Sequence, residues 1–306
     1  MSHEKYDALI AACARLQPVR TAVVHPCDDI SLDSALQAAA LGIIQPVLVG
    51  PEARIRALAE SLNLDLAGVE IVDAPHSHAA AAQAVDMVRA GAADALMKGS
   101  LHSDELLGAV VSKTLGIRSE RRISHVFVMD VPTYSKPLFI TDAAVNINPT
   151  LEEKADIVQN AIDLAHAVGI ATPKVAILSA VETVTSKIPS TLDAAALCKM
   201  ADRGQITGGM LDGPLALDNA ISREAAALKN INSMVAGDAD ILVVPNLEAG
   251  NILAKQLIFL AHADSAGIVL GARVPIIFTS RADNMRARLA SCAIAALCVD
   301  AQGKAL

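Results

Sequence analysis

The sequence is poor in aromatic residues, with no tryptophan, four phenylalanines and two tyrosines among 306 residues. It therefore offers few rings on which nucleobases could stack, and its formal net charge of −8 repels phosphodiester backbones. The hydrophobic fraction is nevertheless 53%, so the core must rest on closely packed alanine, valine, isoleucine and leucine. These features argue against a nucleic-acid-binding protein.

The chain also lacks the patterns of a disulfide framework, a metal site and a membrane span. Its five cysteines are odd in number and include no C-x-x-C pair, which argues against paired disulfides and structural zinc. No H-E-x-x-H, Walker or G-x-S-x-G motif is present. No uncharged apolar run approaches the ~20 residues of a transmembrane helix, and no signal peptide is visible. We therefore expect a soluble, cytoplasmic protein without a metal or a membrane partner.

Short β-branched runs alternate with amphipathic stretches along the chain. The first pair is RTAVVHP, residues 20–26, followed by the helical pattern of residues 31–42. This alternation is typical of parallel sheets covered by helices. Further strands are predicted at 45–50, 69–73, 93–99, 123–130, 137–142, 174–180, 208–212 and 239–246, further helices at 51–63, 78–90, 103–115, 150–169, 190–203, 217–229 and 250–263, and two strands and a helix after residue 266.

The alternation is interrupted near residue 125. The strand-like runs 123–130 and 137–142 are separated by VPTYSK, which is too short for a helical crossover, so we expect them to pair antiparallel. A new series then begins with a helix in which Thr150 and Glu153 have capping-box spacing. Because the chain exceeds the usual ~100–200 residues of one domain, we expect a lobe boundary at this interruption.

The turn FTSRADN, residues 278–284, follows an apolar strand and carries a hydroxyl, a cation and an acid. Ligands of parallel sheets sit beyond the carboxyl ends of the strands. Ser280 is a candidate N-cap of the next helix, whose first amide groups favour an anion, and Arg281 could grip phosphate in two places. The structural alternative is an ordinary helix cap followed by a surface arginine and a first-turn Asp283.

Three further loops after predicted strands carry polar residues or glycine. In the first, Lys98 and Gly99 could hold an oxyanion, although a solvated lysine is the simpler explanation. The other two loops offer hydrogen-bonding side chains or close backbone approach, and helix capping alone would account for the aspartate among them. Their candidate residues are Asp218, Asn219, Asn246, Gly250 and Asn251.

Long segments in a fixed order resemble the phosphate acetyltransferase/phosphate butyryltransferase family, and most closely its butyryltransferase-like branch. They are MKGSLHSDELL, LFITDAAVNINPTLEEKADIVQNAI, PKVAILSAVETV, GQITGGMLDGPLALDNAIS, VAGDADILVVPNLEAGNILAKQL and PIIFTSRADN. The similarity runs from about residue 20 to the end. It implies a two-lobed α/β fold like that of isocitrate and isopropylmalate dehydrogenases, with parallel-rich sheets flanked by helices and a cleft between the lobes. The first lobe would comprise residues 1–128 and 268–306, and the second 129–267.

The resemblance also implies an activity: a homodimeric acyltransferase that converts acyl-CoA and inorganic phosphate reversibly to acyl phosphate and coenzyme A. Phosphate would attack the thioester directly, and no cofactor would be needed. Ser280 and Arg281 match the family's active-site Ser-Arg pair, in which the serine would bind the thiol or phosphate and the arginine would neutralise charge. Lys98, Gly99 and Arg122 lie where family members place phosphate- or substrate-binding groups.

One position departs from the better-known acetyltransferase branch, which resembles S-R followed by an acid seven residues after the serine. Position 287 is alanine here, so Asp283 is the nearest carboxylate for the base that takes the CoA thiol proton in the reverse reaction. Two alternatives are a metal- and NAD-dependent dehydrogenase of the related fold, for which no clear acid triplet is visible, and a noncatalytic acyl-CoA-binding protein. Some relatives carry a fused hydratase-like domain, an activity that we expect to be absent.

Overall fold

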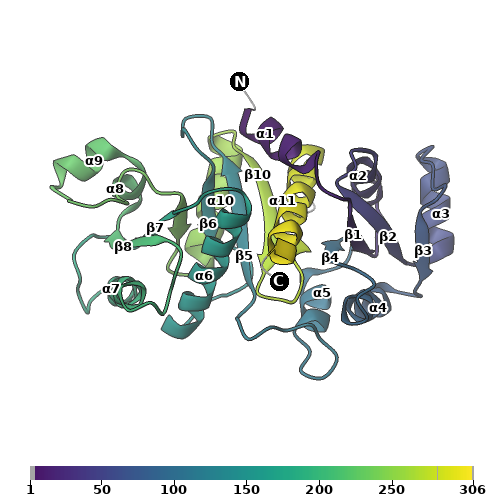
Figure 1. Cartoon of the computed structure of the whole chain (residues 1–306), viewed down its shortest axis with the longest axis horizontal. Helices are drawn as coiled ribbons and strands as arrows, with labels where there is room; N and C mark the ends of the chain where they lie inside the picture. The colour runs from purple at the N-terminus through teal and green to yellow at the C-terminus, as the bar shows by residue number, and fades with distance from the viewer. Residues whose placement is uncertain (1–3, 281, 305–306) are drawn as a thin grey trace. The chain divides into compact units, whose positions relative to one another are not determined.

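The chain forms two compact units in a computed structural model that describes residues 4–280 and 282–304 (Figure 1). The middle unit comprises residues 4–5 and 122–265, and the terminal unit comprises residues 6–121 and 266–304. Each contains a mainly parallel sheet flanked by helices. The two-lobed α/β class expected from the sequence is therefore confirmed.

In the terminal unit the strands lie in the order β3-β2-β1-β4-β11-β10. All neighbouring pairs described here are parallel except β10 and β11, so β1, β4 and β11 end at the same edge of the sheet. The elements are α1 (Glu4–Cys13), β1 (Val19–Val24), α2 (Asp29–Ala40), β2 (Ile44–Gly50), α3 (Glu52–Ser61), β3 (Glu70–Asp73), α4 (Ser77–Arg89), β4 (Ala95–Lys98), α5 (Ser103–Val110), β10 (Asp264–Leu270), β11 (Ile276–Ile277) and α11 (Met285–Lys304).

In the middle unit the strands lie in the order β5-β6-β9-β7-β8. β5 and β6 pair antiparallel, as their short connection predicts, while β6, β9, β7 and β8 are parallel to one another. The elements are β5 (Ser124–Asp130), β6 (Leu138–Thr141), α6 (Leu151–Ala167), β7 (Lys174–Leu178), α7 (Pro189–Asp202), β8 (Met210–Leu215), α8 (Leu217–Ile221), α9 (Arg223–Leu228), β9 (Ile241–Val243) and α10 (Leu247–Leu260).

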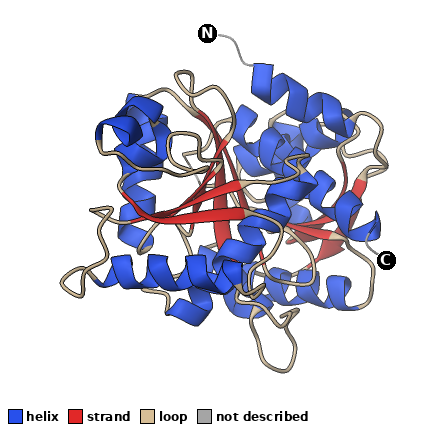
Figure 2. Ribbon diagram, turned by 60° about the vertical axis from the view of Figure 1, so that its left-hand side comes forward, coloured by secondary structure: helices blue, strands red, loops and turns tan. Residues whose placement is uncertain are grey.

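Helices flank the strands within each unit, and the cores are almost entirely aliphatic (Figure 2). Phe139 is the largest fully buried side chain among the described residues. The capping box of α6 is present as predicted, with Thr150 Oγ1 accepting from the Glu153 amide and the Glu153 carboxylate accepting from the Thr150 amide. Each helix within the described ranges is too short or too polar to cross a membrane.

Three predicted helices differ from the observed ones by more than two residues at one end or are divided in two. The helix predicted at 103–115 ends at Val110, because the chain turns back and the Ile117 amide donates to the Val110 carbonyl (2.9 Å). The helix predicted at 217–229 is two helices, because Ser222 is extended and caps the second one. The helix predicted to begin near residue 250 begins at Leu247, since Asn246 already caps it.

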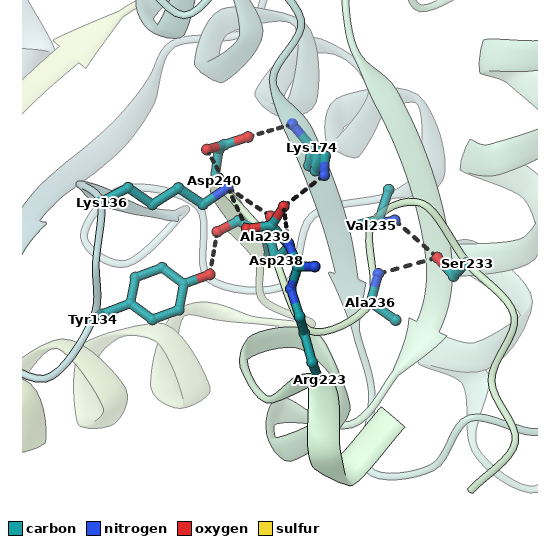
Figure 3. Close-up of polar contacts among 10 residues, drawn as sticks. All are labelled: Tyr134, Lys136, Lys174, Arg223, Ser233, Val235, Ala236, Asp238, Ala239 and Asp240. Carbon is teal, nitrogen blue, oxygen red and sulfur yellow. Dashed lines mark hydrogen bonds and ion pairs between the residues drawn. The ribbon is translucent and has the colours of Figure 1, made fainter. Parts of the chain in front are cut away.

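A cluster of charged residues joins the amino-terminal ends of β6, β7 and β9 (Figure 3). Asp238 forms ion pairs with Lys136 (3.2 Å), Lys174 (2.6 Å) and Arg223 (3.1 Å). Asp240 also pairs with Lys136 (2.7 Å). Nearby, the Tyr134 hydroxyl donates to the Ala239 carbonyl (2.6 Å), and burial raises the pKa of Tyr134 to about 12. Since the negative charges of the aspartates and the positive charges of the lysines and the arginine cancel here, we assign these strand ends a structural role.

Replacing Asp238 by asparagine should destabilise the protein by about 1–3 kcal/mol, because Lys174 and Arg223 lose a charged partner. The pKa of Asp238 is lowered, chiefly by its hydrogen bond from Lys174. Its stabilising effect is therefore complete above the unfolded pKa of about 4 and disappears as the pH falls through the lower folded value. Urea unfolding at several pH values should show the Asp238→Asn deficit shrinking in acid. Asp94→Asn, at an exposed position, is the control; an equal deficit there would contradict the prediction.

Candidate active site

Lys98 ends β4 beside the strand that leads into the turn of Ser280. β11 pairs parallel with β4, with Ile277 opposite Met97, and Lys98 Nζ lies 5.9 Å from the centroid of the Phe278 ring. Lys98 is only 5% exposed, so the simpler explanation of a solvated lysine is wrong. A lysine is rarely buried so deeply, and its charge makes this edge of the sheet suited to an anion.

The turn itself is closed by Ser280 and Asp283. The Ser280 amide donates to Asp283 Oδ2 (2.6 Å), and the Asp283 amide donates back to the Ser280 carbonyl (3.2 Å). Ser280 Oγ accepts from the Ala282 amide (3.3 Å), and the Ser280 side chain is exposed. The turn thus presents a hydroxyl and a carboxylate close together, next to the strand pair that holds Lys98.

The expectation that Ser280 caps the following helix is wrong. α11 begins only at Met285, and Asn284 provides the cap, its Oδ1 accepting from the Ala287 amide (2.9 Å). The physical reason is that the Ser280 hydroxyl accepts from the Ala282 amide and closes a separate turn before the helix starts. The Ser280 hydroxyl therefore does not lie at the first helical turn.

Asp283 is half-buried and has an unusual acidity for an aspartate. Burial raises its pKa above the ordinary value, and the hydrogen bond from the Ser280 amide, the charge of Arg288 and the charge of Lys98 oppose that rise. A carboxyl with a raised pKa accepts a proton more readily than a solvated one. The arrangement can therefore perform general-base chemistry beside a serine hydroxyl.

Two sequence candidates in this unit need comment. Arg281 lies outside the described residues. Gly99 follows Lys98, and a Cβ at that position would lie 2.6 Å from the His25 carbonyl oxygen. The end of β1, which pairs parallel with β4, thus leaves no room for a side chain at this position. Close packing of the backbone explains this glycine, and contact with a ligand stays a prediction.

In the middle unit, three acceptors hold Arg122 in place. Its Nε donates to Asn146 Oδ1 (2.8 Å), its Nη1 pairs with Glu153 (3.0 Å), and its amide donates to Asp156 (2.8 Å). About half of the side chain remains exposed. An arginine that is fixed at one end and accessible at the other is well suited to bind an anionic ligand.

The loop after β6 fixes the side chain of Asn146, which accepts the hydrogen bond from Arg122. Buried Asp142 accepts hydrogen bonds from the amides of Ala144, Val145 and Asn146 and from Asn146 Nδ2. Asn146 Nδ2 also donates to the Ile123 carbonyl (2.8 Å). The side chain of Asn146 is therefore fixed, with its oxygen directed to Arg122.

Asn246 caps α10, and Gly250 and Asn251, which lie within that helix, contact this same loop. Asn251 Nδ2 donates to the Ala143 carbonyl (3.1 Å), and a Cβ on Gly250 would lie 2.8 Å from the Asp142 carbonyl oxygen. Asn246 caps α10 through the Ala249 amide (3.0 Å). The expectation that Gly250 precedes its helix is wrong, since it lies inside α10 and allows the helix to pack on the loop.

Asp218 and Asn219 form a different group, at the start of α8. Asn219 is fully buried; its Nδ2 donates to Glu182 (3.2 Å), and Oδ1 has no hydrogen-bond partner within the described ranges. Lys229 pairs with both Asp218 (3.3 Å) and Glu182 (3.5 Å). The predicted candidates of the middle unit are thus divided between the loop after β6 and this second group after β8.

Sequence reasoning missed three residues that orient the candidates: Asp142, Asn146 and Arg288. Asp142 ends a predicted strand and Asn146 follows four residues later, which was an available signal. Arg288 is a charge within the apolar helix RLASCAIAALC, where burial of an ion requires a reason. Within the described residues, no group of three or more histidine, cysteine, aspartate or glutamate side chains is placed to hold a metal ion.

Comparison with known proteins identifies the fold and then the family. The solved structure of a branched-chain phosphotransacylase from Enterococcus faecalis V583 matches with a TM-score of 0.79 and 31% identity, over 92% of this chain and 99% of that one. The fold is therefore that of the phosphotransacylases. The family model described as phosphate acetyl/butaryl transferase matches residues 75–296, and the chain belongs to that family.

Two relatives represent the two names within the family. A phosphate acetyltransferase of Rhizobium meliloti is 66% identical over 293 residues, which cover 96% of this chain and 93% of the relative. A phosphate butyryltransferase of Clostridium acetobutylicum is 41% identical over 294 residues, covering 96% of this chain and 98% of the relative. The family resemblance inferred from the sequence is confirmed.

Substituting alanine for Gly250 should lower stability by about 1–3 kcal/mol, because the new methyl group overlaps the Asp142 carbonyl and forces α10 away from the loop. Gly108→Ala in α5 is the matched control: it is also helical, nothing lies within 4 Å of the added Cβ, and it should be neutral or stabilising. Thermal and urea unfolding of both variants test this. Equal stability of the Gly250 variant and the wild type would show that α10 does not pack on the loop as described.

Proposed function

We propose that this chain converts acyl-CoA and inorganic phosphate reversibly to acyl phosphate and coenzyme A. A phosphate oxygen forms a bond to the acyl carbon, the carbon–sulfur bond breaks, and its electron pair leaves with the sulfur as the CoA thiolate. In the reverse direction the CoA thiol gives its proton to a base, the sulfur attacks the acyl carbon, and phosphate leaves. Acyl-CoA and phosphate, or acyl phosphate and CoA in reverse, are the reactants, and we propose no additional cofactor.

The observation that carries this proposal is the family membership of nearly the whole chain. The relatives described above, named phosphate acetyltransferase and phosphate butyryltransferase, align over 96% of it. A dehydrogenase or a noncatalytic binding protein is less consistent with the relatives described above, which are named as phosphate acyltransferases or phosphotransacylases. The two names leave acetyl and butyryl transfer as candidates.

The catalytic roles that we propose centre on the turn of Ser280. Its hydroxyl hydrogen-bonds the reacting thiol or phosphate, Arg281 neutralises the charge that develops on the oxyanion, and Asp283 takes the thiol proton. The hydrogen bond between the Ser280 amide and the Asp283 carboxylate supports this pairing, because it keeps hydroxyl and base together. Buried Lys98, on the neighbouring strand, contributes a second positive charge for phosphate.

For the remaining candidates we propose substrate binding. Arg122 is favoured by its fixed and half-exposed guanidinium, and Gly99 by its position after Lys98. The other proposed binding residues are Asp218, Asn219, Asn246, Gly250 and Asn251. Among these, Asn219 is supported by a carbonyl oxygen that has no hydrogen-bond partner within the described ranges, which suits an N–H or O–H donor of a ligand.

Purified wild-type protein should release CoA, detected with a thiol reagent, when phosphate is added to acetyl-CoA or butyryl-CoA. Ser280→Ala should lower kcat about 100-fold, the usual effect of losing one preorganised donor, while its melting temperature stays unchanged because the side chain is exposed. Ser61→Ala, on α3, is the control. Near-normal turnover by both Ser280→Ala and Arg281→Gln would reject the assignment. The rates with acetyl-, propionyl-, butyryl- and branched acyl-CoA then define the acyl group.

We further propose a cytoplasmic homodimer. All five cysteines are free thiols, four of them buried, as expected in a reducing compartment. An exposed apolar stripe on α10, formed by Ile252, Phe259 and Leu260, supports self-association through that helix, since each side chain is at least 66% exposed. Residues seven apart, such as Ile252 and Phe259, share one helical face.

Phe259→Asp should convert a dimer of the wild type into a monomer at micromolar concentration, because a charge would be buried in the contact between two α10 helices. Sedimentation velocity measures this directly. Leu228→Asp, at an equally exposed position at the end of α9, should leave the dimer intact. A monomeric wild type, or a variant at position 259 that still dimerises, would contradict the proposed contact.

A further inference from the structure

Arg288 is a buried cation that the reaction described above does not use. It lies in the first turn of α11 and is only 3% exposed. Within the described ranges its Nη1 has no hydrogen-bond partner. A buried guanidinium with an unsatisfied donor lowers stability compared with an apolar side chain of similar size, so its presence calls for a reason other than packing.

The two other donor groups of Arg288 reach both ends of the turn. Nη2 donates to the Ser280 carbonyl (2.9 Å), and Nε makes a longer bond to the Asp283 carbonyl (3.4 Å). The same two residues are already joined by the Ser280 amide and the Asp283 carboxylate. One side chain from the helix therefore fixes the turn as a unit against α11.

Arg288 also acts on Asp283 through its charge. Its positive charge lowers the pKa of Asp283, in the same direction as Lys98 and against the effect of burial. The groups that act on Arg288 in turn are Asp283, Asp28 at the start of α2, and Cys292 one turn further along α11. Burial lowers the pKa of the Arg288 guanidinium, but not enough to discharge an arginine.

We propose that Arg288 is a positioning residue, which holds Ser280 and Asp283 in the geometry that acyl transfer requires and keeps Asp283 ionised to accept the thiol proton. The proposal rests on the proposed function, since that function gives Ser280 and Asp283 their roles. Arg288 itself touches neither acyl group nor phosphate in this scheme.

Two substitutions of Arg288 distinguish its hydrogen bonds to the turn from the effect of its charge on Asp283. A guanidinium reaches two carbonyls with donors in a fixed plane, whereas a lysine ammonium is a single point of charge on a flexible chain. Arg288→Lys therefore keeps the charge near Asp283 but loses the fork. Arg288→Met loses both and retains most of the buried volume.

The test is the pH dependence of kcat and kcat/KM for CoA in the direction of acyl-CoA synthesis. Arg288→Met should lower kcat about 100-fold, the effect of displacing a catalytic group by about 1 Å, and should move the acid limb of the profile to higher pH. Arg288→Lys should leave the acid limb at the wild-type position while kcat is reduced. Arg286→Met is the matched control; that guanidinium stacks over the Tyr6 ring at 4.0 Å, and its loss should move neither quantity.

A readout independent of activity is hydrogen exchange of the Ala282 and Asp283 amides. It should accelerate in Arg288→Met and less so in Arg288→Lys, while melting temperature stays the same or rises in the methionine variant. A methionine variant with wild-type kcat and an unmoved acid limb would overturn the proposal. So would equal losses of kcat in both variants with unchanged hydrogen exchange and an unmoved limb.

The same measurements distinguish this proposal from the function on which it rests. If the wild type forms no acyl-CoA from acyl phosphate and CoA, the proposed function fails, whatever the variants do. If the wild type turns over and Arg288→Met matches it, only the role of Arg288 is rejected.

Discussion

The parallel pairing of β4 with β11 is the constraint on which the terminal unit's candidate site depends. These strands are far apart in sequence, and their pairing places the end of β4 next to the start of the Ser280 turn. Because parallel strands all end at the same edge, Lys98 and the turn must lie together once the pair forms. The short length of β11, two residues, means that little backbone pairing secures this juxtaposition. The burial of Ile276 and Ile277 and the contacts of Arg288 supply the rest.

In the middle unit, the polar groups with a structural role lie at the amino-terminal ends of the strands, and the candidate functional groups lie at the carboxyl ends. At the amino-terminal edge, Asp238 and Asp240 neutralise Lys136, Lys174 and Arg223 (Figure 3). At the carboxyl edge, polar groups are held chiefly by hydrogen bonds to backbone and amide groups. There the carboxylate of Asp142 is used to shape a loop and not to cancel a cation. Arg122 pairs there with one carboxylate, that of Glu153, and is half-exposed, so it keeps more of its charge available to a ligand than a cation enclosed by several acids.

The strands and most helices could be predicted because their signals are local: apolar alternation, cap residues and glycines after helices all act within a few positions. The capping box of Thr150 and Glu153 is an example. The errors arose where two local signals competed or where tertiary contacts decided. Ser280 looked like a cap, but its hydroxyl accepts from the Ala282 amide in a separate turn, and Asn284 caps the helix. The glycine at 250 was expected before its helix but lies inside α10, and backbone from distant segments packs against both it and Gly99. The burial of Lys98 depends on a strand almost 180 positions away, which no local pattern reports.

The proposed mechanism uses Asp283 as the base, and not a residue at position 287, because the two positions differ in burial and in nearby charge. Position 287, where the resemblance to the acetyltransferase branch implies an acid, is buried in α11 in this chain, and alanine suits it. A carboxylate there would have to be desolvated next to the packed helix, and would need a cation of its own. Asp283 is only half-buried, is anchored by the Ser280 amide, and stands near the positive charges of Arg288 and Lys98. In the proposed mechanism Ser280 and Asp283 therefore supply both the hydroxyl and the base, and the helix needs only to hold the turn in place.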